Sequence, residues 1–482
     1  MTPGGDLARA GASGAMWQGL AFVSGRLIVL ATTVVLARLL SPEEYGLVAF
    51  ALVLMLYTES VADAGVAQAL VYLPRTKVMA QSALLISLGL GTSLALIVAL
   101  GAPLTSEVFG FPAAVPLIQV ISVSIFATSC GAVPEALLRR DLRFRQLTAA
   151  PVIRAALMGS VTLLLAFQGQ GALSLALGTV AGSVGYAATC WYLVRHDAPW
   201  RFWRSSWHSI RANLSFGAPV AGSSLLARLI FDVDYLIIGL VLGAQALGYY
   251  TLAFRLPEAL ILNVFFVLST VLFPLYTQVR DDPYRLRAGY LKSMQIQALY
   301  GVPAGVGLAV LAPVLVPLLF GPQWGDAVLP LTLLAIYAAV RSLGAGANDV
   351  YKALGRPGLS ITISIIRLLI LVPVLFFATQ WGIAGIASAQ LAVAVIFAVG
   401  MQTVAAKVIR IRTSMMFQAV LPGLVCGAAV AVSGLITLVL PLLGGAATAV
   451  LVIFVALPMV YLILRLGFPE LHKDLLTLVR LR

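Results

Sequence analysis

The chain has 482 residues, of which 61% are hydrophobic and only 10% are charged, and its mean hydropathy is +1.01. Soluble globular proteins carry about 25% charged residues, so this composition excludes a soluble globular chain. The formal net charge is +13. In a chain this apolar, such an excess is expected to mark one face of a membrane, so nucleic acid is not an expected partner.

Long apolar runs separated by short polar connections predict an all-α polytopic membrane protein with about 14 transmembrane helices. In chain order the helices are expected at residues 15–40, 46–71, 81–104, 113–136, 148–167, 171–194, 214–241, 247–275, 293–320, 327–351, 359–379, 383–406, 415–440 and 445–466. These runs are uniformly apolar, whereas transmembrane β-strands alternate polar with apolar residues. The helices account for most of the chain, so no folded domain is expected outside the membrane.

The positions of lysine and arginine test this helix count independently. Every second connection, together with the two termini, holds 24 of the 31 basic residues, and the opposite connections hold none. The opposite connections carry acids instead, namely Glu43, Glu44, Glu107 and Asp326. By the positive-inside rule both termini are expected in the cytoplasm, with the basic face beside anionic membrane lipids.

The sequence repeats itself at an offset of 202 residues. Arg26-Leu27-Ile28 matches Arg228-Leu229-Ile230, and in both copies a long helix then ends in a short outer turn, SPEEYG at 41–46 and GAQALG at 243–248. Four further identities follow the same alignment: Leu40, Gly46, Ala51 and Leu54 match Leu242, Gly248, Ala253 and Leu256. Six helices per copy is an even number, so two parallel-oriented lobes are expected, as in transporters that rock two bundles about a central site.

This repeat predicts the organisation of the chain. Residues 1–194 are expected to form an N-lobe of helices 1–6, and residues 214–406 a C-lobe of helices 7–12, with helices 13–14 appended at 407–466. Arginines and tryptophans alternate in the connection 195–213, and the tail 467–482 is amphipathic. Both segments are therefore expected at the cytoplasmic membrane surface.

Charged side chains inside the predicted helices are the candidate functional residues. A charge near the bilayer centre costs on the order of 3 kcal/mol, so such residues are expected to face a water-filled cavity or one another. Guanidinium groups bind phosphate oxygens through two parallel hydrogen bonds. The candidate substrate-binding residues for an anionic cargo are Arg26, Arg228, Arg255, Arg341 and Arg367. In contrast, Arg38, Glu135 and Asp349 lie near helix ends and are expected to reach the interface.

Four acidic residues are candidates for coupling transport to a proton or a sodium ion. Glu59 and Asp63 lie one turn apart on the second predicted helix, and Asp232 and Glu258 follow an arginine by four and three residues. A structural alternative stays open for each pair. Asp232 and Glu258 could serve only to neutralise the arginine beside them, and Glu59 and Asp63 could serve only to hold helices together.

The sequence carries no signal for chemistry other than transport. The three cysteines and three histidines are scattered along the chain, and no GxxxxGK[ST] segment occurs. Neither a metal, a cofactor nor an ATP site is therefore expected, and the chain is not expected to be an enzyme.

The chain resembles a known family in its opening and in the second copy of the repeat. The segment GAMWQGLAFVSGRLIVLATTVVLARLLSPEEYGLVAFALVL at 14–54, the D-x-G of Asp63-Ala64-Gly65, and DVDYLIIGLVLGAQALGYYTLAFRL at 232–256 carry the resemblance. They are similar to the bacterial polysaccharide transporters, the Wzx-type O-antigen and exopolysaccharide flippases of the multidrug/oligosaccharidyl-lipid/polysaccharide exporter superfamily. The resemblance covers essentially the whole chain.

This resemblance implies a flippase of the bacterial cytoplasmic (inner) membrane. It would move undecaprenyl-pyrophosphate-linked oligosaccharide repeat units to the outer leaflet by alternating access, with a polysaccharide polymerase and chain-length machinery as partners. A peptidoglycan-precursor flippase and a drug/cation antiporter of the same superfamily stay open, although the excess of arginine inside the helices disfavours a cationic cargo. A membrane-embedded polysaccharide polymerase or acyltransferase is a more distant alternative, because the outer connections are short and lack histidine.

Overall fold

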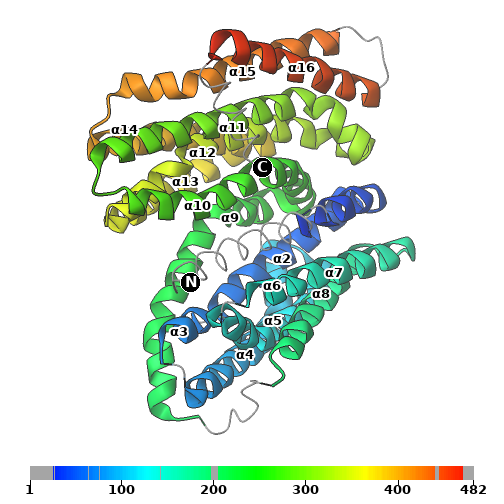
Figure 1. The fold of residues 1–482 in the computed structure, drawn as a ribbon. Coiled ribbons are helices and arrows are strands. Elements are labelled where there is room, and N and C mark those ends of the chain that lie inside the picture. Colours follow the sequence, from blue (N-terminus) through cyan, green and yellow to red (C-terminus); the bar gives the residue numbers. More distant parts are fainter. Residues whose placement is uncertain are drawn as a thin grey trace. The chain divides into compact units, whose positions relative to one another are not determined.

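The structure is a computed structural model that describes residues 25–26, 28–62, 65–74, 76–141, 143–196, 205–439 and 445–469. Over these residues the backbone forms helices joined by short connections, and no strand occurs among them (Figure 1). The predicted all-α class is therefore confirmed. The chain divides into two compact units, Met1–Gly248 and Tyr249–Arg482.

The first unit is built around α5, which packs against α2, α4 and α8. After the helical residues Ile28–Leu39, its elements are α2 (Pro42–Ala62), α3 (Val66–Tyr72), α4 (Lys77–Phe109), η1 (Pro112–Ala114), α5 (Val115–Arg140), α6 (Phe144–Leu147), α7 (Ala149–Phe167), α8 (Ala172–Leu193) and the larger part of α9 (Trp207–Pro257). Small residues permit this packing: a Cβ on Gly131 of α5 would lie 3.2 Å from the Cα of Ala187 on α8. Such close backbone approach is typical of helices that associate within a membrane.

The second unit is built around α11, which packs against α12, α15 and α16. Beyond the end of α9, its elements are η3 (Glu258–Leu262), α10 (Asn263–Gln278), α11 (Pro283–Leu319), η4 (Pro322–Ala327), α12 (Val328–Ala353), α13 (Pro357–Ala378), η5 (Thr379–Trp381), α14 (Gly382–Ile409), α15 (Thr413–Val439) and α16 (Gly445–Gly467). Figure 1 shows α15 and α16 side by side. Glycines again allow two helices to approach closely, since a Cβ on Gly423 of α15 would lie 2.8 Å from the Cβ of Ala298 on α11.

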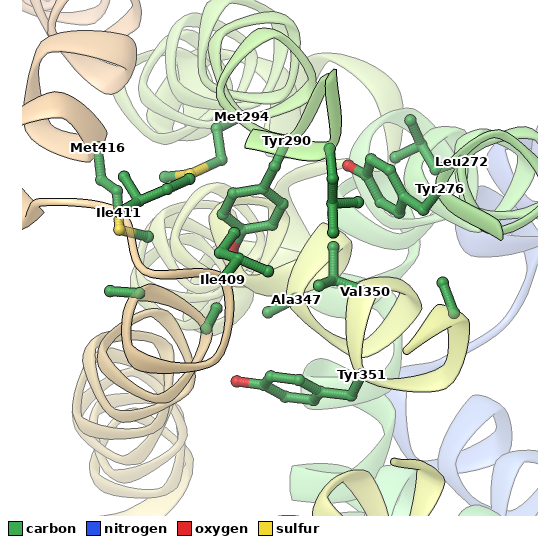
Figure 2. Packing of buried hydrophobic residues seen from close by; sticks show 14 residues of the cluster. Leu272, Tyr276, Tyr290, Met294, Ala347, Val350, Tyr351, Ile409, Ile411 and Met416 are labelled. Carbon is green, nitrogen blue, oxygen red and sulfur yellow. The ribbon is translucent and has the colours of Figure 1, made fainter. Parts of the chain in front are cut away.

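The core of the second unit combines aliphatic side chains with buried tyrosines (Figure 2). The hydroxyl of Tyr290 donates to Oε1 of Gln402 at 2.6 Å, and the hydroxyls of Tyr276 and Ser293 are bonded to each other. Water is absent from the interior of a bilayer, so buried polar groups there need partners within the protein. These bonds tie α10, α11 and α14 together at defined positions.

Each predicted transmembrane segment overlaps helical residues in the described part of the chain, although some segments, such as 46–71, contain more than one helical element. Ten helical stretches of these residues are long and apolar enough to cross a membrane, and the number fourteen stays a prediction. Two of the ten stretches each cover residues of two predicted helices, namely Phe231–Gln278 and Gly358–Ile409. Glycines with positive φ interrupt both: Gly243 has φ 89° and ψ 177°, and Gly382 has φ 65°. Glycine adopts such angles without steric cost.

Several helices begin earlier than their apolar runs indicate, at the end predicted to be cytoplasmic. The α4 helix starts at Lys77, where the side chain of Thr76 accepts a hydrogen bond from the Met79 amide at 3.2 Å. The α11 helix starts at Pro283, where Asp282 accepts from the next two amides at 3.0 and 3.1 Å. Capping residues thus begin these helices outside the apolar run. Similarly, α9 begins at Trp207, inside the predicted connection 195–213.

The structure corrects the expectation for Asp349. This residue lies one turn before the end of α12, but its exposed fraction is 2%. Both of its carboxylate oxygens accept from the Ser269 hydroxyl of α10, at 2.8 and 2.7 Å. The expectation that Asp349 reaches the interface is wrong because α10 packs over this face of α12.

Candidate functional site

Glu59 of α2 lies at a polar junction of four helices in the first unit. Its Oε1 accepts a hydrogen bond of 2.8 Å from the Thr128 hydroxyl of α5. Arg154 of α7 and Arg228 of α9 are near enough to act on its charge. A guanidinium group near a carboxylate stabilises its charge, and the carboxylate competes with any other anion for that guanidinium.

Arg228 forms an ion pair on its own helix. Its Nη1 lies 3.5 Å from Oδ2 of Asp232, and the exposed fractions of the two side chains are 37% and 22%. The pair expected from the spacing therefore forms. However, the charge of Arg228 also acts on Glu59 of another helix, so Asp232 is not the only acidic residue that Arg228 influences.

Arg26 and Asp63 are less fully described. Arg26 is half-buried in helical backbone. A Cβ on its neighbour Gly25 would lie 3.9 Å from the Cβ of Ala155, which follows Arg154 on α7. This places the turn that carries Arg26 beside the turn that carries Arg154. Asp63 lies outside the described residues.

The D-x-G motif ends in a close backbone contact. Gly65 has φ 63° and separates α2 from α3, and a Cβ there would lie 2.7 Å from the Cα of Gly217 on α9. Only a residue without a side chain fits at this position, both for its φ and for the space available. The glycine of this motif therefore has a packing role in the first unit.

Arg255 and Glu258 form the second expected pair, in the second unit. Arg255 Nη1 lies 3.6 Å from Glu258 Oε2, and 31% of each side chain is exposed. Glu258 begins η3, a single π-helical turn. Such turns are rare and occur frequently at functional sites because they redirect the side chains that follow.

Arg341 and Arg367 converge on one tyrosine of the second unit. Nη1 of Arg341 donates to the hydroxyl of Tyr337, one turn earlier on α12, and Nη2 of Arg367 on α13 lies 3.4 Å from the same oxygen. The ring of Phe254, which precedes Arg255, lies 6.0 Å from the Tyr337 ring. The structure thus brings together two arginines that are 26 residues apart in the sequence.

Tyr337 was not among the residues predicted from the sequence for this cluster. Its side chain is buried, and its hydroxyl serves two guanidinium groups that carry like charge. The Nε of Arg367 is also buried and has no hydrogen-bond partner. A buried donor without a partner costs about 1–3 kcal/mol, so this guanidinium retains capacity to bind an anion. The only sequence signal was the spacing of Tyr337 and Arg341, four residues apart on one helix.

Across the described part of the chain, no three His, Cys, Asp or Glu side chains are placed to hold a metal ion. Guanidinium groups bind anions reversibly, and carboxylates bind cations in the same way.

Comparison with known sequences identifies a family. Residues 35–329 match the family described as "Polysaccharide biosynthesis protein". The chain is 25% identical over 373 residues to the lipopolysaccharide biosynthesis protein WzxC of Escherichia coli (strain K12), an alignment that covers 76% of this chain and 75% of that protein. It is 30% identical over 309 residues to the succinoglycan biosynthesis transport protein ExoT of Rhizobium meliloti (strain 1021), covering 63% and 61% of the two chains.

Comparison with solved structures identifies a fold. The lipid II flippase MurJ, in an inward closed conformation, matches 93% of this chain and 99% of its own with a TM-score of 0.75 at 14% identity. An inward-facing multidrug resistance transporter of the MATE family matches 81% and 98% with a TM-score of 0.64 at 18% identity. At these identities the likeness concerns the fold alone.

Proposed function

Because the chain belongs to the polysaccharide biosynthesis protein family, we propose that it is a flippase for a lipid-linked oligosaccharide. Its cargo is an undecaprenyl-pyrophosphate-linked polysaccharide repeat unit, which moves from the cytoplasmic to the outer leaflet by alternating access. The observation that carries this proposal is the family match over residues 35–329. The names of two relatives, which refer to lipopolysaccharide biosynthesis and succinoglycan transport, support it.

The pyrophosphate is the part of the cargo whose negative charge the protein has to stabilise inside the membrane. An anion in a low-dielectric interior is costly unless it is paired and hydrogen-bonded. The arginines of the two clusters supply such pairing through forked N–H groups. We assign cargo binding to Arg26, Arg228, Arg255, Arg341 and Arg367.

Glu59 is the strongest candidate for ion coupling. When Glu59 is charged, its carboxylate attracts the guanidinium groups of Arg154 and Arg228. When Glu59 takes up a proton or a sodium ion, these two groups would become available to the cargo. The cargo and the coupling cation would therefore bind together, because each removes the competitor of the other. Asp63, Asp232 and Glu258 are the further candidates for this role.

The protein is a multi-pass membrane protein, and we place it in the bacterial inner membrane with both termini in the cytoplasm. No covalent step is required of it, because the cargo crosses unchanged. The delivered repeat unit is then the substrate of an enzyme that joins repeat units on the outer side. A polysaccharide polymerase and chain-length machinery are therefore the expected partners.

Reporter fusions should give an alternating pattern along the chain. Alkaline phosphatase fused after Glu44 or Asp326 is expected to lie outside the cytoplasm and to be active. Green fluorescent protein fused after Arg143 or Lys292 is expected to lie inside the cytoplasm and to fluoresce. The physical reason is the charge asymmetry of the connections, since basic segments stay on the cytoplasmic side. Paired alkaline phosphatase and green fluorescent protein fusions measure this, and a reversed signal at one of the four positions would refute the proposed topology.

Reconstitution tests the cargo directly. Proteoliposomes holding the purified full chain are expected to move an undecaprenyl-pyrophosphate-linked oligosaccharide between leaflets faster than protein-free liposomes. Accessibility of the sugar to an added glycosidase or lectin measures this movement. Movement of the peptidoglycan precursor alone would favour the precursor flippase, and movement of a cationic drug alone would favour the antiporter. Protein that moves none of the three would contradict the proposal.

A further inference from the structure

The two outer turns of the repeat touch through their glycines. Both Gly46 and Gly248 are buried in the first unit. A Cβ on Gly46 would overlap the carbonyl oxygen of Ala244 and lie 2.9 Å from the amide nitrogen of Gly248. A Cβ on Gly248 would overlap the carbonyl oxygen of Pro42 and lie 3.1 Å from the amide nitrogen of Gly46. The contact is therefore backbone against backbone, with no room for a side chain.

The contact follows the internal repeat. Gly46 and Gly248 are separated by the repeat offset of 202 residues, and so are Pro42 and Ala244. The contact of Gly46 with Ala244 thus has its counterpart in the contact of Gly248 with Pro42. In an isologous contact the same patch is used twice about a twofold axis. The two contacts are therefore reciprocal, because each turn uses the same two repeat positions.

Each turn is shaped by its own local chemistry. In the first turn, the amide of Ser41 donates to Oε2 of Glu44 at 2.9 Å, and the amide of Glu44 donates to Oγ of Ser41 at 3.2 Å. This is a capping box, and Pro42 holds the first helical position. In the second turn, the chain reverses at Gly243 with φ 89° and ψ 177°, a conformation that is essentially restricted to glycine. The two turns therefore differ in local structure, but each places its glycine in the same contact.

An apolar layer adjoins the contact. The ring of Phe50 lies 4.6 Å from that of Phe109 and 5.2 Å from that of Phe111. A Cβ on Gly239 would lie 3.8 Å from both Phe50 and Phe111, and 3.6 Å from Leu247. Phe50 belongs to α2, Phe109 to the end of α4, Phe111 to the connection that follows it, and Leu247 to α9. These segments therefore meet in an apolar contact next to the glycines. The touching backbones leave no room for water or a sugar between them at this point.

We propose that the Gly46–Gly248 contact is the outer gate of transport, and that these two glycines are positioning residues for alternating access. This inference rests on the proposed flippase function. The gate is closed in this structure and opens when the two turns separate to release cargo outside. The four residues whose backbones touch carry no charged side chain, namely Pro42, Gly46, Ala244 and Gly248. They can therefore separate without leaving a charge of their own unpaired.

The test uses a cysteine placed below the gate. Tyr57 lies eleven residues after Gly46 on α2, which is about 16 Å along a helix, and its side chain is near the charge of Asp232. The reporter Tyr57→Cys is made in a chain whose Cys130, Cys190 and Cys426 are replaced by serine. Labelling of this reporter by a membrane-impermeant maleimide is then measured separately in right-side-out and in inside-out vesicles.

Gly46→Ala and Gly248→Ala are expected to raise outer labelling of this reporter by about tenfold or more, because the added methyl group clashes in the closed state and shifts the population toward the open one. Gly101→Ala is the matched control, since a Cβ there has no atom within 4 Å, and it should leave labelling unchanged. Variants that reach the membrane and label normally from inside, yet show no rise outside, would overturn the proposal.

A second measurement works without the glycine substitutions, in case they prevent folding. Cysteines at Pro42 and Ala244 are joined by a short bifunctional thiol reagent, which is expected to stop outer labelling of a reporter placed below the contact and to stop transport. If the linked protein still transports its cargo, the proposal that this contact is the outer gate is wrong. Labelling can be measured in both experiments without adding any cargo. If the labelling results are as expected but the protein moves no lipid-linked oligosaccharide, the proposed cargo is contradicted and the proposed gate is not.

Discussion

Replacing Arg228 with alanine is expected to reduce delivery of the repeat unit to the outer leaflet by about ten- to hundredfold, the effect of losing a charge-assisted hydrogen bond of about 1.5–3 kcal/mol. The level of protein in the membrane should stay close to normal, because about a third of this side chain is exposed. Arg228→Lys keeps the charge but loses the forked geometry, so intermediate activity is expected. Surface polysaccharide in a complementation assay, normalised to membrane protein level, measures both.

The double variant Arg228→Ala with Asp232→Ala separates cargo binding from local neutralisation. The two side chains lie 3.5 Å apart, so a single alanine also leaves Asp232 without this partner. If Arg228 served only Asp232, removing both charges would restore activity, because breaking an ion pair costs more than removing it whole. We expect the double variant to remain inactive. Full activity in it would exclude a role of Arg228 in binding the cargo.

Replacing Arg367 with alanine is expected to slow transport by about tenfold or more in proteoliposomes, since its buried Nε and forked N–H groups are then lost to the pyrophosphate. The structural reason is that Arg367 reaches from α13 to the hydroxyl that Arg341 also uses on α12. Arg367→Lys should restore part of the rate, because it keeps the charge and not the fork. The initial rate at several cargo concentrations distinguishes weaker binding from slower movement.

Two further variants control for indirect effects at this cluster. Tyr337→Phe keeps the ring contact with Phe254 and removes the shared hydroxyl, so we expect a smaller loss, of about threefold, from displaced guanidinium groups. Arg412→Ala removes an exposed arginine that follows α14 and should leave the rate unchanged. An equal loss in Arg367→Ala and Arg412→Ala would assign the effect to net charge of the protein and not to the cluster.

Composition and periodicity were sufficient to predict the class of the fold. A long uniform apolar run forms a helix in a membrane because the backbone must satisfy its own hydrogen bonds there. The breaks were predictable for the same local reason. Pro42 and Gly243 stand where the two copies of the repeat were expected to turn. The α2 helix begins at Pro42, and the helical backbone of α9 is interrupted at Gly243. The ion pairs of Arg228 and Arg255 were predictable too, because a helix brings residues three and four positions apart onto one face.

The partners that lie on other helices were decided by the tertiary structure. No spacing rule connects Glu59 with Thr128, or Arg367 with Tyr337, since such contacts depend on the rotation and depth at which helices pack. The burial of Asp349 has the same origin, because α10 covers a face that the position near a helix end would otherwise expose. The sequence by itself determined which segments are helical and where they turn, since these depend on neighbours along the chain. The composition of the charged clusters and the glycine contact depend on the close packing of distant segments, and only the tertiary structure decided them.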